Sequence, residues 1–242
     1  MNIDEFDVEL FNYLNSVFSG EVLNDWTAKF ISFFKILNKN SYVIKFCRAN
    51  LMLNWILKIF LIKKSILLIR HPLAVISSQL KHGVWKNVKP PYIFQDEFKK
   101  NFPKIVENLK GVNEQEEILA VNWAIETLIP LLNPKPYPFI LTSYEKLVLE
   151  KAKELKRILL LLDINTVKDL QLLLNRPSKT TRENSNVFIG DNLLCTWKKY
   201  LSKKQIKNIL NVINKVGIDF YDIDLEPDYQ RMNNFTINFN YV

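Results

Sequence analysis

The sequence predicts an α/β protein built on a parallel β-sheet. Short apolar runs with the length of buried strands alternate along the chain with longer segments whose apolar residues recur at helical spacing. With 242 residues, of which 48% are hydrophobic, the chain is long enough to bury one large core. No internal repeat and no linker marks a boundary, so we expect a single domain over residues 1–242.

The first part of the chain supplies the clearest alternation of strands and helices. Aromatic residues at helical spacing predict core-facing helices near the N-terminus. Residues 41–46 and 65–69 are predicted strands, and residues 50–60 are a predicted helix between them. After a turn that holds Arg70, His71 and Pro72, an amphipathic helix runs towards Leu80 and ends before Gly83. This order of elements is typical of a parallel sheet.

The rest of the chain repeats the pattern after an insert. Residues 86–103 are charged and interrupted by prolines, which predicts a surface loop or lid without helical periodicity. The later segments share clear start or stop signals: a helix at 114–132, a strand at 138–142, a helix at 151–162, a polar loop at 176–186, and a largely helical region at 192–216 before an irregular tail.

The turn after the strand at 65–69 has the properties of an anion site. A helix N-terminus offers unpaired backbone N–H groups and the positive end of the helix dipole. Arg70 adds a guanidinium that matches phosphate oxygens, and Ser78 adds a hydroxyl two turns further on. Without further information, Arg70 could equally be the structural partner of a carboxylate.

Composition excludes several classes of function. The net charge of +8 and the pI near 9.3 suggest an anionic partner, but the lysines are scattered rather than gathered into a basic arm, so we expect no nucleic-acid binding. The two cysteines and two histidines do not have the spacing of a metal site. Two cysteines also form no disulfide framework, which indicates a reducing compartment. The acidic N-terminus is unlike a signal peptide, and lysines interrupt the most apolar stretch. We therefore expect a cytoplasmic protein without a membrane span.

Familiar catalytic motifs do not fit this sequence. His71 follows an arginine, as in histidine phosphatases, but Pro72 comes next and His82 is the only other histidine. There is no G-x-S-x-G elbow. The five glycines are too far apart to form a G-x-x-x-x-G-K-[ST] phosphate loop or a G-x-G-x-x-G turn.

Three segments, in order, resemble the sulfotransferase superfamily. The strand, turn and helix carrying Arg70, Pro72, Val75 and Ser78 resemble its 3′-phosphate-binding segment. FILTSYEKLVLEKAKELKRILLLLDI resembles the strand, Tyr-Glu-x-Leu and helix that follow later, with Tyr144 as the tyrosine. RPSKTTRENSN and the Trp-Lys segment after it, with Trp197, Lys198, Leu201 and Ser202, resemble the C-terminal phosphate loop and helix. Lys45 also lies near the end of a matching upstream strand, and the resemblance spans about residues 41–220.

The resemblance implies a fold like that of the P-loop nucleoside triphosphate hydrolases, a three-layer sandwich with helices on both faces of a parallel sheet. It implies transfer of a sulfuryl group from 3′-phosphoadenylyl sulfate to a hydroxyl or amine acceptor, without a metal. Arg70 and Ser78 would hold the 3′-phosphate, and Tyr144 would lie by the adenine. Lys179 or Arg182 would add a cation near the same phosphate.

The sequence departs from the family at its N-terminal end. Members begin with a strand and a Pro-x-Ser-Gly-Thr-Thr-type loop around the 5′-phosphosulfate, and residues 1–40 contain nothing similar. The sequence thus predicts a sulfotransferase-like chain without its first strand and P-loop, and it identifies no catalytic base. The alternative is a catalytically inactive relative that serves as a binding or structural protein. The acceptor stays open in both cases.

Overall fold

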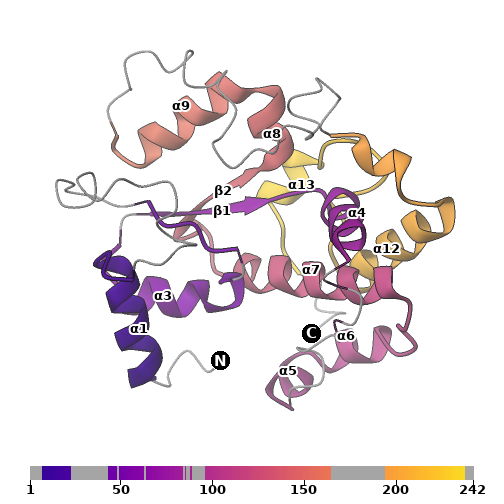
Figure 1. Ribbon diagram of the computed structural model, residues 1–242, viewed down its shortest axis with the longest axis horizontal. Helices are drawn as coiled ribbons and strands as arrows, with labels where there is room; N and C mark the ends of the chain where they lie inside the picture. Colours follow the sequence, from indigo (N-terminus) through magenta and orange to yellow (C-terminus); the bar gives the residue numbers. More distant parts are fainter. Residues whose placement is uncertain are drawn as a thin grey trace.

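The computed structural model describes residues 7–22, 43–47, 49–62, 64–83, 85, 88, 96–164 and 194–237. Within them, helices surround a small sheet (Figure 1). The helices are α1 (Val8–Phe18), α3 (Leu53–Ile59), α4 (Pro72–His82), α5 (Asp96–Asn101), α6 (Pro103–Asn108), α7 (Gln115–Leu131), α8 (Tyr144–Leu149), α9 (Lys151–Leu161), α12 (Lys203–Lys215) and α13 (Tyr229–Asn233), with the 3-10 helices η1 (Asn50–Met52) and η2 (Thr196–Lys199).

The sheet of the described residues consists of two parallel strands, β1 (Ser65–Ile69) and β2 (Phe139–Ser143). Ser65 pairs with Phe139 and Ile69 with Ser143, so the strands are in register over their whole length. Parallel strands end at the same edge of a sheet. The residues that follow β1 and β2 therefore begin side by side.

The two faces of β1 differ in how they are covered. Leu67 and Ile69 point into the main core and are 3% and 4% exposed. Ile66 and Leu68, on the opposite face, are 44% and 47% exposed. Figure 1 shows α8 and α9 on one side of the sheet and α3 and α7 on the other. Described residues thus bury one face of strand β1 and leave its other face partly exposed.

The helix α7 lies at the centre of the main core. It begins with a capping box between Glu114 and Glu117, and it packs against α4, α12 and η1. The buried apolar residues of α4, α7 and α12 form one continuous cluster that also includes the C-terminal residues Phe220, Met232 and Phe235. A second, smaller cluster joins α1 to α3, where Phe60 stacks on Phe11 with ring centroids 5.3 Å apart.

A buried carboxylate fastens α9 to β2. Glu154 is 1% exposed and accepts hydrogen bonds from Thr142 Oγ1 at 2.6 Å and from Arg157 Nε at 2.9 Å. Arg157 also donates to the carbonyl of Leu141 at 3.0 Å. Burial alone would raise the pKa of Glu154, but the hydrogen bonds from Arg157 and Thr142 outweigh it and lower that pKa. The carboxylate therefore stays ionised as a structural link.

The structure confirms most of the predicted elements. Strand β1 has the expected bounds, and helix α4 ends before Gly83 as predicted; the φ of Gly83, 67°, is in the left-handed region that glycine tolerates. Helix α4 already includes Pro72, which was predicted in the turn, because proline suits the first position of a helix. Strand β2 begins one residue later than predicted. The predicted helices at 50–60, 114–132 and 151–162 correspond to η1 with α3, α7 and α9. The loop at 176–186 lies outside the described residues.

Three expectations about the elements were wrong. Residues 43–46, the described part of the predicted strand 41–46, form no strand, and Val43 is fully exposed because no described strand lies beside it. The insert at 86–103 contains the short helix α5, which buries Phe98 against Phe102. The tail after Asp222 contains α13, whose N-terminus is capped by Asp228.

The protein is therefore α/β in the coarse sense that the sequence predicts. A sheet of two parallel strands with helices around it is what the described residues contain. Among them, no helix is long and apolar enough to cross a lipid bilayer.

Core packing in α7 can be tested with a matched pair of leucines. Leu128 is fully buried, whereas Leu160 on α9 is 75% exposed. We expect Leu128→Ala to lower the free energy of unfolding by about 2–5 kcal/mol, because it removes buried methyl groups and leaves a cavity. Leu160→Ala should change it by less than about 0.5 kcal/mol. Urea unfolding followed by circular dichroism measures both, and equal losses would contradict the assignment of α7 to the core.

Candidate functional site

The carboxyl ends of β1 and β2 bring two of the predicted site residues together. Arg70 directly follows β1 and Tyr144 directly follows β2. The guanidinium carbon of Arg70 lies 4.5 Å from the centroid of the Tyr144 ring, which is a cation–π contact. The parallel register of the sheet thus explains why residues 74 positions apart in the chain meet here.

Arg70 is held in place, but its side chain keeps unused hydrogen-bonding capacity. Trp123 Nε1 on α7 donates to the backbone carbonyl of Arg70 at 3.1 Å. The side chain is half-buried, and its Nε is buried without a hydrogen-bond acceptor. No carboxylate of the described residues forms an ion pair with it. The alternative of a structural ion pair therefore finds no support in the described part of the chain.

The backbone at the start of α4 differs from the sequence expectation. The N–H of Leu73 donates to His71 Nδ1 at 3.2 Å, and the N–H groups of Ala74 and Val75 donate to the carbonyl of His71 at 3.0 and 3.1 Å. Pro72 has no N–H to offer. The expected set of unpaired N–H groups is absent from this helix start, because His71 caps it from within the chain.

His71 is a structural residue rather than a catalytic base. Its ring Nε2 donates to the backbone carbonyl of Asp224 at 2.8 Å, while Nδ1 accepts from Leu73. The ring stacks on Trp197 with centroids 5.7 Å apart. Burial lowers the pKa of His71 to about 4, so the ring is neutral near pH 7. Both nitrogens are occupied, which agrees with rejecting a histidine phosphatase.

Glu145 joins the site to the C-terminal segment. Its carboxylate is 1% exposed and accepts from the N–H of His71 and from the hydroxyl of Tyr221, both at 2.9 Å. Burial raises the pKa of Tyr221, so its hydroxyl keeps its proton and donates. We call these three residues the Glu145 clamp. The Tyr-Glu pair after β2 is part of the predicted resemblance, and no pattern in the sequence points to Tyr221.

The other residues predicted to bind the nucleotide are not brought to this point by the described structure. Ser78 lies exposed on α4, and no hydrogen bond joins it to Arg70. Lys179 and Arg182 lie outside the described residues. Lys45 is exposed, and Trp197 belongs to the buried core. Arg70 and Tyr144 are therefore the pair that the described structure assembles.

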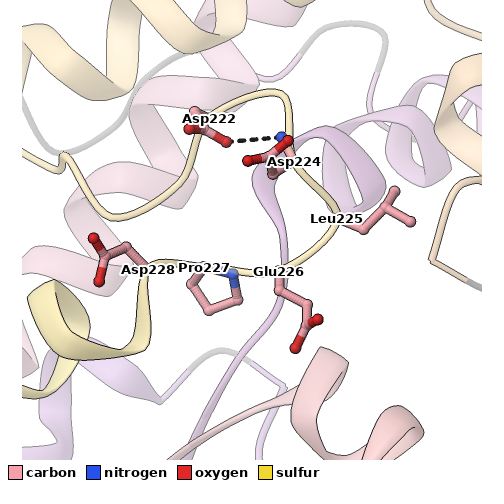
Figure 2. Close-up of a pocket in the computed structure, with 6 residues that line it drawn as sticks. All are labelled: Asp222, Asp224, Leu225, Glu226, Pro227 and Asp228. Carbon is pink, nitrogen blue, oxygen red and sulfur yellow. Dashed lines mark hydrogen bonds between the residues drawn. The ribbon is translucent and has the colours of Figure 1, made fainter.

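Residues 222–228, which we call the acidic loop, lie next to the Glu145 clamp, and six of them line a cavity of about 530 Å³ (Figure 2). Asp222 Oδ1 accepts from the N–H of Asp224 at 2.7 Å, Asp228 caps α13 through the N–H of Arg231, and Glu226 accepts from Tyr229. Figure 2 shows Asp222 and Asp224 together, with Glu226 and Asp228 pointing elsewhere. The described residues contain no group of side chains arranged to bind a metal ion.

Comparison of the chain with protein-family models, with curated proteins and with solved structures gave no match.

The Glu145 clamp can be tested by removing one hydroxyl. Tyr221→Phe leaves one oxygen of a buried carboxylate without a donor, so we expect it to lower the free energy of unfolding by about 1–3 kcal/mol. Tyr200→Phe removes an exposed hydroxyl that accepts from Lys81 and should cost about 0.5 kcal/mol or less. Urea unfolding of both variants is the measurement. A Tyr221→Phe protein as stable as Tyr200→Phe would contradict the clamp.

The buried neutral His71 predicts a pH dependence of stability. Its folded-state pKa of about 4 lies below the ordinary value of 6.5, so the unfolded chain binds more protons between these values. Stability should therefore fall as the pH falls from about 6.5 to 4, with a contribution from His71 of about 3 kcal/mol. His71→Asn keeps an acceptor for the α4 cap and cannot titrate. Its unfolding free energy should depend less on pH than that of the wild type, and parallel pH curves would contradict this account.

Proposed function

We propose that this chain binds the 3′-phosphate of an adenine nucleotide at Arg70 and Tyr144, and that it is a sulfotransferase using 3′-phosphoadenylyl sulfate as donor. The observation that carries the proposal is the half-buried guanidinium of Arg70, which stacks on Tyr144 and has no carboxylate partner among the described residues. The resemblance of three ordered segments to sulfotransferases supplies the identity of the nucleotide and of the reaction.

The charge and position of Arg70 support binding of a phosphate group. A guanidinium presents a planar fork of donors that matches two phosphate oxygens, and partial burial weakens competition from water. Residues just beyond the carboxyl ends of parallel strands line the ligand crevice in open α/β sheets. The guanidinium lies over the Tyr144 ring, and this ring would contact the adenine of the same nucleotide.

Arg70 carries most of the proposed phosphate binding. The start of α4 is capped internally and offers no unpaired N–H group, and the nearby acidic loop supplies carboxylates rather than cations. Ser78 is the other residue proposed on α4. In sulfuryl transfer, positioning of the donor and neutralisation of its charge would be the main work of the protein. The acceptor would be a hydroxyl or an amine.

A second candidate is a catalytically inactive nucleotide-binding relative. The sequence of residues 1–40 favours it, since it contains nothing similar to the Pro-x-Ser-Gly-Thr-Thr-type loop that surrounds the 5′-phosphosulfate in the family. A transfer assay with labelled donor and a panel of hydroxyl and amine acceptors separates the two candidates. Label in product supports the enzyme, and nucleotide binding without transfer to any acceptor supports the inactive relative.

The binding proposal predicts a specific loss of affinity. Titration of the purified chain with 3′-phosphoadenosine 5′-phosphate by calorimetry should show binding that Arg70→Ala weakens by about tenfold or more, because a charge-assisted hydrogen bond is worth about 1.5–3 kcal/mol. Arg70→Lys keeps the charge but loses the planar fork and should fall between the two. Lys100→Ala, on the distant α5, is the matched control and should bind like the wild type. Equal affinities for all four proteins would overturn the site.

A further inference from the structure

Tyr221 lies in the C-terminal segment, and its side chain joins three elements that surround the proposed nucleotide site. It is 2% exposed, and its hydroxyl donates to Glu145 at 2.9 Å. Its ring is in edge contact with the rings of His71 and Trp123, with centroids 4.9 and 5.8 Å apart. The turn after β1, the helix α7 and the start of α8 thus each present a partner to one buried tyrosine.

On the arginine side, two of these partners hold the backbone of Arg70. Trp123 Nε1 donates to the carbonyl of Arg70 at 3.1 Å. His71 directly follows Arg70, and its Nε2 donates to the carbonyl of Asp224 at 2.8 Å, which anchors the turn to the same C-terminal segment. A displacement of the Tyr221 ring would therefore reach the backbone of Arg70 through both rings that it touches.

On the tyrosine side, the connection runs through a carboxylate. Glu145 directly follows Tyr144, and its two oxygens accept from the N–H of His71 and from the hydroxyl of Tyr221. Loss of the hydroxyl would leave one oxygen of a buried carboxylate without its donor, which is costly enough to make the side chain turn toward another one. That movement begins at the residue next to Tyr144.

We infer that Tyr221 is a positioning residue, which sets the place of the Arg70 guanidinium over the Tyr144 ring without touching the nucleotide. This role presupposes the nucleotide site proposed above. Arg70 Nε is buried without an acceptor, so no hydrogen bond at this nitrogen fixes the guanidinium. Its place depends instead on the backbone before α4 and on the ring 4.5 Å away, and Tyr221 acts on both. A binding group that is held ready in its bound geometry loses less entropy when the ligand arrives.

The first test measures affinity in folded protein. Calorimetric titration with 3′-phosphoadenosine 5′-phosphate should show that Tyr221→Phe weakens binding about fivefold, although the removed hydroxyl touches no ligand. Leu14→Ala is the destabilised control, because it removes buried methyl groups from the separate cluster between α1 and α3, and it should bind like the wild type. Circular dichroism confirms that each variant is folded during the titration. Wild-type affinity of Tyr221→Phe would overturn the inference.

A double-mutant cycle tests whether Tyr221 acts through Arg70. In an Arg70→Ala background there is no guanidinium to position, so Tyr221→Phe should change the affinity by less than about twofold. Equal losses in both backgrounds would reveal a general structural role and contradict positioning.

A measurement without nucleotide distinguishes a failure of this role from a failure of the proposed function. The Nε–H of Arg70 gives an NMR signal whose chemical shift depends on the Tyr144 ring, and Arg70→Lys identifies the signal by removing it. Tyr221→Phe should move this signal more than Leu14→Ala does. If it moves and the wild type binds no nucleotide, Tyr221 positions the pair and the nucleotide proposal is wrong. If it stays in place, the positioning role is wrong whether or not the nucleotide binds.

Discussion

The hydrogen bonds of the buried Glu145 carboxylate are the contact on which the arrangement of the site depends. A carboxylate with 1% exposure would cost several kcal/mol if left without donors. Its two donors come from the turn after β1 and from the C-terminal segment, while Glu145 itself follows β2. Because Arg70 precedes His71 and Tyr144 precedes Glu145, the clamp that ties these three segments also sets the distance between the arginine and the tyrosine.

The same contacts determine which groups at this edge of the sheet can meet an anion. The backbone N–H of His71 donates to Glu145, its carbonyl and Nδ1 accept from the first turn of α4, and its Nε2 donates to Asp224. No N–H group in the first turn of α4 is therefore unpaired, although the helix dipole remains. The guanidinium of Arg70, which no described carboxylate neutralises, is the group at this edge of the sheet that is left to meet one.

The sequence predicts what depends on local patterns and fails where distant partners decide. Strand β1 and helix α4 follow from a short apolar run, Pro72 and Gly83, all within one segment. Residues 43–46 have a strand-like composition, but a strand also needs a neighbour, and alternation of residues does not reveal whether one is present. Arg70 was predictable as the residue after a buried strand. The role of Tyr221 was not, because it depends on one hydrogen bond across 76 positions of the chain.

The surroundings of Arg70 determine which kind of anion it suits. Its guanidinium is half-buried and lies over the Tyr144 ring, which favours a small rigid anion that accepts two hydrogen bonds in one plane. Exposed lysines such as Lys203 and Lys207 are point charges on flexible stems and present no such plane. The net charge of +8 is therefore a poorer guide to anion binding than the position of this one arginine.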